Sequence, residues 1–341
     1  MKAFIGTYSK DILYLNENEI YPCGKCDSPS YLAYYNNDIV AISELADFDN
    51  KETGTVNFFK NNNNILTEKS SNLSFGKYPC HLTTANGICF VANYGSGTVS
   101  AYNVENGMEL IKTIEHDTVF ENKIHDVDSK FYDYLDKEKC AKIEGRQKTA
   151  HAHSTVLTSD NKYIAACDLG QDKVVFYDFE MNIHSVFQLP SGQGPRHIIF
   201  DENKAYIVTE LASTLITCAY NDGILTFESL TYTLKKDDIT NNAPAAIRFS
   251  PCKKYIAVSN RGHDSISLFD VKNNMKLIQN ISSYGKGPRD IEFSNDGKFL
   301  LCANQNSNNI SFYSVTDGKL EYLYEKTLDC SPVMILFEKN S

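Results

Sequence analysis

One pattern of apolar and polar residues recurs along the chain, and it is clearest just after Pro195. An apolar run over residues 198–200 is followed by a tight turn and a second apolar run over residues 206–208. Antiparallel neighbours bring the start of one strand and the end of the next to the same edge of a sheet. Polar residues stand at those two places, and we expect them to lie together. They are Arg196, His197 and Glu210.

The same pattern returns seven times along the chain. Its anchor residues stand at positions 29, 79, 152, 195, 244, 288 and 332, and all of them except Ala152 are prolines. The intervals between anchors are 50, 73, 43, 49, 44 and 44 residues. A period in the forties with four short β-rich runs is typical of a β-propeller. The sequence therefore predicts an all-β, seven-bladed propeller over residues 1–341 as a single domain; a two-sheet sandwich would not explain the spacing.

One repeat shows the four strands of a blade. We expect an innermost strand over residues 245–249, followed by strands over residues 255–259, 265–271 and 276–282. Asp296-Gly297 and Asp317-Gly318 are the dipeptides expected of tight hairpins. The pattern therefore predicts four-stranded antiparallel blades.

The two ends of the chain and one long interval depart from the repeat. The last anchor precedes a single strand, residues 333–337, while residues 3–8 and 12–15 have no anchor strand before them. We expect these segments to share one blade, which removes free sheet edges. The long interval holds a charged insertion over about residues 116–148. We expect it to form a short helix, to return beside His151 and to cover the mouth of the central channel.

Charge and composition limit the classes of molecule that we expect the chain to bind. The formal net charge of −10 opposes binding to nucleic acid and to anionic membrane surfaces. The chain has no run of about 18 apolar residues and does not start with the long apolar region of a signal peptide. Its ten cysteines are scattered, as in a reduced protein. We expect a cytoplasmic protein, a monomer or weak homodimer, whose ligand is a small anionic molecule held by a few local cations.

Each repeat places polar residues at the start of its first strand and the end of its second. The starts are His81, His151, His153, Arg196, His197, Arg289 and Asp290; the ends are Asn93, Tyr94, Asp168, Glu210, Asn260, Arg261, Asn304 and Gln305. In a seven-bladed propeller these residues would meet around one central mouth. Several arginines and histidines with one glutamate suit acid–base chemistry on an anionic small molecule.

Departures from the repeat are the better candidates for chemistry. The recurring residues Asn93, Asn260 and Asn304 are expected to cap turns, and Asp168 is expected to behave similarly. Glu210 is taken to stand where other repeats have Asn or Asp, and Arg261 where neighbouring repeats have Leu211 or Gln305. We therefore rank Arg196, Glu210, Arg261 and His153 first.

A metal site is an alternative interpretation of the histidines in this set. His151 and His153 alternate along a strand, so they could point the same way, with Glu210 or His197 as a third ligand. Flanking arginines would repel a dication. We therefore expect no metal and no cofactor.

Four segments carry a resemblance to a known family. Residues 147–154, 194–197, 208–211 and 259–266 resemble signature segments of the lactonase family of seven-bladed propellers, which includes propeller-type 6-phosphogluconolactonases and the fungal 3-carboxy-cis,cis-muconate lactonising enzyme. The resemblance covers nearly the whole chain. Ala150 departs from it, because the family often has proline there, and the 116–148 insertion is longer than usual. The resemblance implies four catalytic residues: His153, Arg196, Glu210 and Arg261.

The resemblance implies hydrolysis of a sugar lactone, foremost 6-phosphoglucono-1,5-lactone, by a metal-independent acid–base mechanism. Either Glu210 or His153 would be the general base, while Arg196 and Arg261 would divide between the oxyanion and the phosphate. Two alternatives stay open: a muconate-type lactonising cycloisomerase, and a non-catalytic propeller that binds a partner through its face. The remaining rim residues are expected to bind substrate: His81, Tyr94, His151, His197, Arg289 and Gln305.

Overall fold

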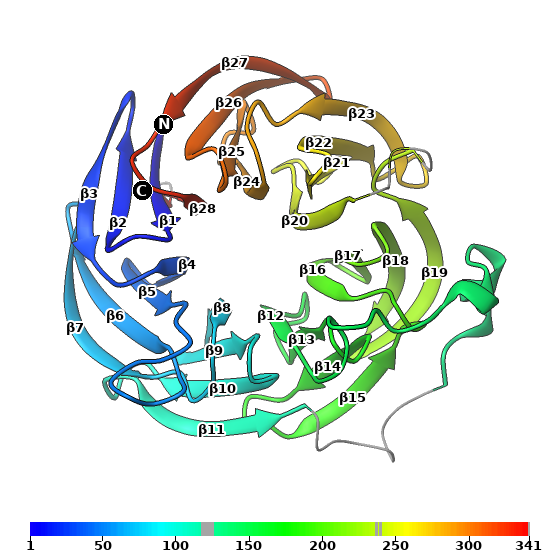
Figure 1. The fold of residues 1–341 in the computed structure, drawn as a ribbon, viewed down its shortest axis with the longest axis horizontal. Helices are drawn as coiled ribbons and strands as arrows, with labels where there is room; N and C mark the ends of the chain where they lie inside the picture. The colour runs from blue at the N-terminus through cyan, green and yellow to red at the C-terminus, as the bar shows by residue number, and fades with distance from the viewer. Residues whose placement is uncertain (117–125, 236–237, 239–240, 340–341) are drawn as a thin grey trace. The chain divides into compact units, whose positions relative to one another are not determined.

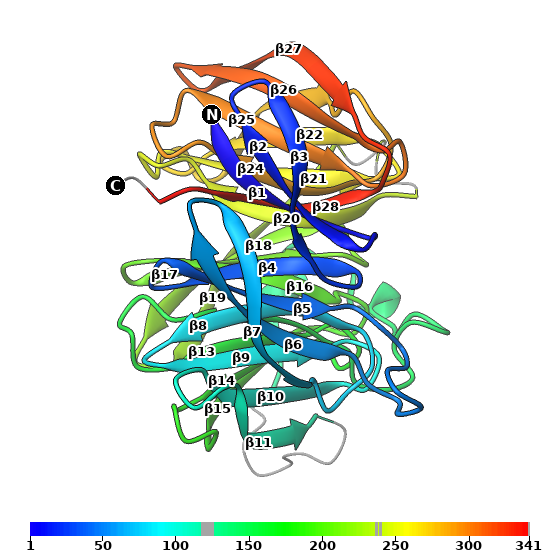
Figure 2. The same cartoon turned by 90° about the vertical axis from the view of Figure 1, so that its left-hand side faces the viewer.

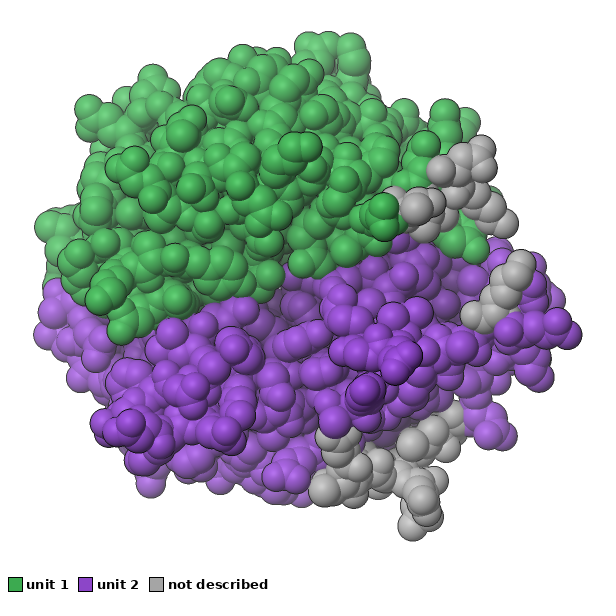
Figure 3. Space-filling model, in the orientation of Figure 1, with its two compact units in different colours: residues 1–32, 62–66, 232–341 green, residues 33–61, 67–231 purple. Residues whose placement is uncertain are grey.

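The computed structural model describes residues 1–116, 126–235, 238 and 241–339. They form seven four-stranded antiparallel sheets (Figure 1). The chain divides into two compact units (Figure 3), and each is described by itself. Unit 1 comprises residues 1–32, 62–66 and 232–341, and unit 2 comprises residues 33–61 and 67–231.

Three sheets belong to unit 1. The first has the order β28-β1-β2-β3, with β1 at Lys2–Thr7, β2 at Asp11–Asn16, β3 at Glu19–Lys25 and β28 at Pro332–Phe337. The second consists of β20 (Ala243–Phe249), β21 (Tyr255–Arg261), β22 (Ser265–Asp270) and β23 (Lys276–Ser282). The third consists of β24 (Pro288–Phe293), β25 (Phe299–Asn304), β26 (Asn309–Thr316) and β27 (Lys319–Thr327).

Three further sheets belong to unit 2. The first consists of β8 (Pro79–Ala85), β9 (Ile88–Asn93), β10 (Thr98–Asn103) and β11 (Glu109–Glu115). The second consists of β12 (Ala152–Leu157), β13 (Ile164–Asp168), β14 (Lys173–Tyr177) and β15 (Ile183–Gln188). The third consists of β16 (Pro195–Asp201), β17 (Lys204–Thr209), β18 (Thr214–Asn221) and β19 (Ile224–Tyr232). The seventh sheet has strands from both divisions of the chain: β4 (Pro29–Tyr35), β5 (Asp38–Ser43), β6 (Thr55–Asn62) and β7 (Ile65–Leu73).

The fold is the predicted seven-bladed propeller with four-stranded antiparallel blades. The strands expected in the sixth repeat match β20 to β23 to within two residues at each end. The predicted closure is also confirmed, because C-terminal β28 pairs with β1, Ala3 facing Phe337 and Ile5 facing Ile335 (Figure 2). The prediction of a single domain over residues 1–341 stays a prediction.

Burial follows the position of each strand within its sheet. The second strands β9, β13, β17 and β25 carry buried residues at nearly every position, whereas outer strands such as β23 alternate between exposed and half-buried. A strand buried on both faces lies between two neighbouring sheets. In unit 2 one such core joins Phe90, Val99, Val175 and Tyr177, all 0 % exposed. Hydrophobic cores between adjacent sheets therefore hold the blades.

A β-bulge follows the anchor residue in the first strand. Pro195 faces Thr209 and His197 faces Val208, so Arg196 is the extra residue between them. The same irregularity recurs in other blades, where the extra residues are Cys80, His153, Arg289 and Val333. A bulge bends the strand and redirects a side chain. In these five blades the bulge thus gives one side chain an unusual direction, and two of these side chains are His153 and Arg196.

The described part of the insertion is docked against unit 2. It contains two 3-10 helices, η1 at Ser129–Asp133 and η2 at Lys137–Lys139, in place of a regular α-helix. Phe131 of η1 is fully buried, and its ring centroid lies 3.8 Å from that of Phe227 and 6.2 Å from that of Phe187. These rings belong to outer strands β19 and β15. The expectation that the insertion covers a central mouth stays a prediction, and its residues 117–125 lie outside the described residues.

Candidate active site

The register of the sheets corrects two alignments made from the sequence. Asn93, Asp168 and Asn304 face the anchors of their blades, and in the blade of Glu210 that place is taken by Thr209. Glu210 is therefore one residue further on, equivalent to Tyr94, Leu169, Arg261 and Gln305, and not to the Asn or Asp. The residue equivalent to Arg261 in the blade of β16 and β17 is accordingly Glu210 and not Leu211. The alignment matched Glu210 to these residues by polarity, although Thr209, like Asn93, lies 14 residues after its anchor.

The residues that face the anchors have structural roles. Asn93 is 0 % exposed and donates to the Ser74 carbonyl and to the Thr98 hydroxyl, both at 3.0 Å. Asn260 and Asn304 make the same kind of bonds to serines of their own blades. The turn-capping interpretation of these asparagines is supported. The catalytic candidates instead stand at the bulge of the first strand of a blade, or just after the residue of the second strand that faces the anchor.

Asp168 is the most elaborate of these structural groups. Its carboxylate accepts the backbone N–H of His151 at 2.9 Å and lies 2.9 Å from His116 Nδ1, in a fully buried setting. Burial alone would raise the pKa of Asp168, but the hydrogen bond and charge of His116 and the charge of Lys173 lower it. Asp168 therefore remains a carboxylate that fixes the backbone in front of β12.

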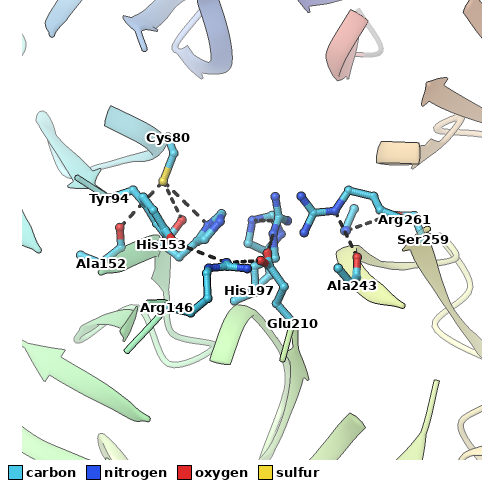
Figure 4. Close-up of polar contacts among 12 residues, drawn as sticks. Cys80, Tyr94, Arg146, Ala152, His153, His197, Glu210, Ala243, Ser259 and Arg261 are labelled. Carbon is cyan, nitrogen blue, oxygen red and sulfur yellow. Dashed lines mark hydrogen bonds and ion pairs between the residues drawn. The ribbon is translucent and has the colours of Figure 1, made fainter. Parts of the chain in front are cut away.

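Glu210 lies between two arginines, all three in unit 2. Arg196 Nε donates to Glu210 Oε2 at 3.1 Å, and Arg146 Nη2 donates to Oε1 at 2.5 Å (Figure 4). Glu210 is 5 % exposed and Arg196 is 2 % exposed. Burial would lower the pKa of Arg146, but the bond to Glu210 raises it. One buried carboxylate shared by two guanidinium groups leaves the cluster one positive charge in excess.

Histidines and a tyrosine form the other side of the cluster. The Tyr94 ring stacks on His151 with centroids 4.5 Å apart and meets His153 edge-on at 5.3 Å. The His153 ring lies 5.6 Å from His197, and His197 lies 5.1 Å from His81. Four predicted substrate-binding residues, His81, Tyr94, His151 and His197, are thus brought beside the predicted catalytic His153.

These contacts close into a circuit. From Tyr94 they pass to His153 and His197; Arg196 Nη1 then donates to His197 Nε2 at 3.2 Å. Arg196 binds Glu210, Glu210 binds Arg146, and Arg146 Nη2 lies 3.4 Å from the Tyr94 hydroxyl. The six side chains come from three stretches of unit 2: one at Tyr94, one from Arg146 to His153 and one from Arg196 to Glu210. Together they provide two imidazoles, a phenol, a carboxylate and two guanidinium cations at one place.

The nitrogen atoms of the three buried histidines are used differently. His197 Nε2 accepts from Arg196, and His81 Nδ1 accepts the backbone N–H of Thr155 at 3.3 Å. His153 Nδ1 lies 3.8 Å from the thiol sulfur of Cys80 (Figure 4). A thiol is a weak hydrogen-bond partner. Of the three, His153 is the one that stands at the bulge of its strand, where the backbone redirects its side chain.

Arg146 is the site residue that the sequence did not indicate. It belongs to the insertion and has no counterpart in the repeat, so periodicity could not single it out. The one available signal was its position directly before residues 147–154, the first segment that resembles the family. Its presence makes the insertion part of the site.

The remaining predicted residues belong to unit 1. Arg261 Nε donates to the Ala243 carbonyl at 3.1 Å (Figure 4), and Arg289 lies over the Tyr8 ring at 5.3 Å. Gln305 donates its backbone N–H to Gly287 at 3.0 Å. The participation of Arg261, Arg289 and Gln305 in the same site stays a prediction.

Two other features, a metal site and a membrane-spanning helix, can be assessed on the described residues. Among the residues that the structure describes, three or more His, Cys, Asp or Glu side chains nowhere converge in a way that could hold a metal ion. Within the same ranges no helix is long and apolar enough to cross a membrane. The ten cysteines are all free thiols.

Comparison with known proteins places the chain in a family. A family model described as "Lactonase, 7-bladed beta-propeller" matches residues 3–337. The chain is 27 % identical to a 6-phosphogluconolactonase of Bacillus subtilis, covering 98 % of this chain and 97 % of that protein. A crystal structure of a protein from Lactobacillus plantarum is 25 % identical, with a TM-score of 0.85 over 99 % of this chain and 100 % of that one.

A more distant structure agrees in fold. The periplasmic gluconolactonase of Pseudomonas aeruginosa is 21 % identical, with a TM-score of 0.81 over 98 % of both chains. With its sheets, its closure and its family match in agreement, the chain belongs to the lactonase family of seven-bladed β-propellers.

Proposed function

We propose that the chain hydrolyses a sugar lactone, foremost 6-phosphoglucono-1,5-lactone, to the corresponding sugar acid. The observation that carries the proposal is the closed circuit of Tyr94, His153, His197, Arg196, Glu210 and Arg146. Its positive excess suits an anionic substrate and the oxyanion that forms when water attacks an ester carbonyl. The family match and the named relative from Bacillus subtilis support the same class of substrate.

His153 is the general base of the proposed mechanism. Both oxygens of Glu210 accept hydrogen bonds from guanidinium groups, which stabilise its charged form and reduce its tendency to take a proton. His153 is the other base that the family resemblance implies. It removes a proton from water as the oxygen attacks the lactone carbonyl, and it returns that proton to the ring oxygen when the carbon–oxygen bond breaks. Glu210 then serves to hold the two arginines in place.

The cations stabilise the negative charge that the attack creates. Arg196 is almost wholly buried and bound to both Glu210 and His197, so its guanidinium is fixed before the substrate arrives. A fixed cation stabilises a developing charge without reorganisation during the reaction. Arg261, implied by the family resemblance, would add a second cation.

The test is proton release from freshly prepared 6-phosphoglucono-1,5-lactone and from glucono-1,5-lactone, with the spontaneous opening subtracted. We expect the wild-type protein to accelerate the phosphorylated lactone more, and to do so equally with and without a chelator. Acceleration of neither lactone would refute the hydrolase function. Loss of the acceleration on addition of chelator would refute the metal-independent mechanism.

A further inference from the structure

The two arginines that bind Glu210 differ in how much of their hydrogen-bonding capacity is used. Arg196 is 2 % exposed and employs both Nε and Nη1 on Glu210 and His197. The Arg146 side chain is 41 % exposed, and Nη2 makes both of its hydrogen bonds. Among the described residues Arg146 Nε and Nη1 have no hydrogen-bond partner. Arg146 therefore offers donors to a ligand at the edge of the cluster.

The backbone that carries Arg146 is held firmly. The N–H groups of Arg146 and Gln147 both donate to the Ile143 carbonyl at 3.1 Å, which closes a turn. The Gln147 side chain is 3 % exposed; its oxygen accepts the Ile143 N–H and its nitrogen donates to the Leu169 carbonyl, each at 2.9 Å. A buried amide satisfied on both sides fixes the turn to the end of β13. The position of Arg146 is thus built into unit 2.

The guanidinium of Arg146 indicates the chemical class of its ligand. A guanidinium presents its N–H groups as a planar fork that matches a phosphate or carboxylate in a bidentate manner. Glu210 neutralises one of the two arginines, and the other charge remains available to an incoming anion. Glu210 also restrains Arg146, because the 2.5 Å bond holds Nη2 while the side chain as a whole stays 41 % exposed.

We propose that Arg146 is the specificity-determining residue that binds the phosphate of the phosphorylated lactone. The inference rests on the proposed function, whose substrate class it refines. Arg146 contacts a part of the substrate that does not react, so it contributes to binding and to discrimination between lactones more than to the chemical step. Arg196 and His153 act on the reacting carbonyl and its water.

The experiment compares wild type with Arg146→Gln, Arg146→Lys and a matched control, Lys142→Gln. Lys142 is a second cation of the insertion and donates to the Gln171 side chain at 3.1 Å, outside the circuit. We expect Arg146→Gln to lower kcat/KM for 6-phosphoglucono-1,5-lactone about 10–100-fold, the usual range for losing charge-assisted hydrogen bonds. The loss should fall on KM, and kcat/KM for glucono-1,5-lactone should change less than about threefold.

The two further variants refine the expectation. Arg146→Lys keeps the charge but not the fork, so it should restore part of the loss. Lys142→Gln should leave the preference for the phosphorylated lactone unchanged. Equal losses on both lactones in Arg146→Gln, or an equal shift in Lys142→Gln, would overturn the proposal, because Arg146 would then act through Glu210 or through general electrostatic attraction.

Calorimetric titration with 6-phosphogluconate and with gluconate separates this inference from the proposed function. We expect the affinity for 6-phosphogluconate to fall about 10–100-fold in Arg146→Gln, with gluconate affinity unchanged. That result would support the phosphate site even if the wild type hydrolysed neither lactone. Unchanged 6-phosphogluconate affinity in a folded Arg146→Gln protein would overturn it, whatever the hydrolytic activity.

Discussion

Two charge clusters of this protein have opposite compositions. In unit 2 one carboxylate, Glu210, is shared by Arg146 and Arg196. In unit 1 one guanidinium, Arg248, is shared by two carboxylates: it donates to Asp290 at 2.7 Å and to Glu292 at 2.6 Å. The first cluster has a cation in excess and the second an anion.

The clusters also differ in how they compensate their excess charge. In unit 1 burial raises the pKa of Glu292 to about 7, against the lowering effect of Arg248, so the surplus negative charge can be removed by a proton. Asp290 is further satisfied by the Ile335 N–H at 2.9 Å. An arginine cannot give up its proton. The surplus positive charge of unit 2 is therefore kept, on an Arg146 side chain that is 41 % exposed and open to an incoming anion. This contrast underlies the proposal that the unit 2 cluster is a ligand site.

The largest expected effect is the fall in kcat when His153 is replaced. In His153→Ala the proposed base is lost, and kcat should fall about 10²–10⁴-fold, as is typical for a general base. Initial rates of lactone opening at saturating substrate measure this. Activity within a few-fold of wild type would show that the histidine side of the unit 2 cluster does no chemistry.

Next in size is the effect of breaking the unit 1 cluster. Arg248→Met leaves Asp290 and Glu292 without their common cation, and removing one partner of a buried ion pair costs about 3–5 kcal/mol. Denaturant unfolding at pH 8 measures the change in the free energy of unfolding, and lactonase activity per folded molecule should be preserved. Lost activity in a protein that remains folded would erase the contrast between the two clusters.

A smaller effect is expected for Glu210. In Glu210→Gln the two guanidinium groups lose the anion that orients them, and misplacement of a positioned group costs about 10²-fold in rate. The variant should lose less than His153→Ala, because its base is intact. If Glu210→Gln were the more damaging of the two, Glu210 would be the base and the assignment made above would be reversed.

The smallest effect concerns the pH dependence of stability. The folded-state pKa of Glu292 is about 7 and its ordinary value is 4.5. Between those values the folded protein binds more protons than the unfolded chain, so this group makes the free energy of unfolding fall as pH rises from about 4.5 to 7. In Glu292→Gln that slope should be reduced, as measured by urea unfolding at pH 5 and pH 8. An unchanged slope would contradict the raised pKa.

Most of the fold was predictable from the sequence because it is periodic. The spacing of anchors such as Pro244 and Pro288 gave the blades, and the unmatched segments at the two ends gave the closure through β28. Turn dipeptides marked their hairpins: Asp317 and Gly318 have φ values of 46° and 74°, which suit a two-residue turn.

The site was predictable only in part. His153, Arg196 and Glu210 were found because polar residues stood out against an apolar repeat, and unit 2 brings all three together. The equivalence of Glu210 with Asn93 was wrong by one residue, because it is Thr209 that lies, like Asn93, 14 residues after its anchor and faces it. Arg146 was missed because a residue of an insertion has no repeat to be compared with.

A crystal structure of the protein with 6-phosphogluconate bound tests the central claim most directly. The unit 2 cluster, with its cation in excess, should hold the acid. Its phosphate should lie within hydrogen-bonding distance of Arg146 and its carboxylate near His153 and Arg196. A ligand bound elsewhere, with the Arg146–Glu210–Arg196 contacts left without an anion, would contradict the account.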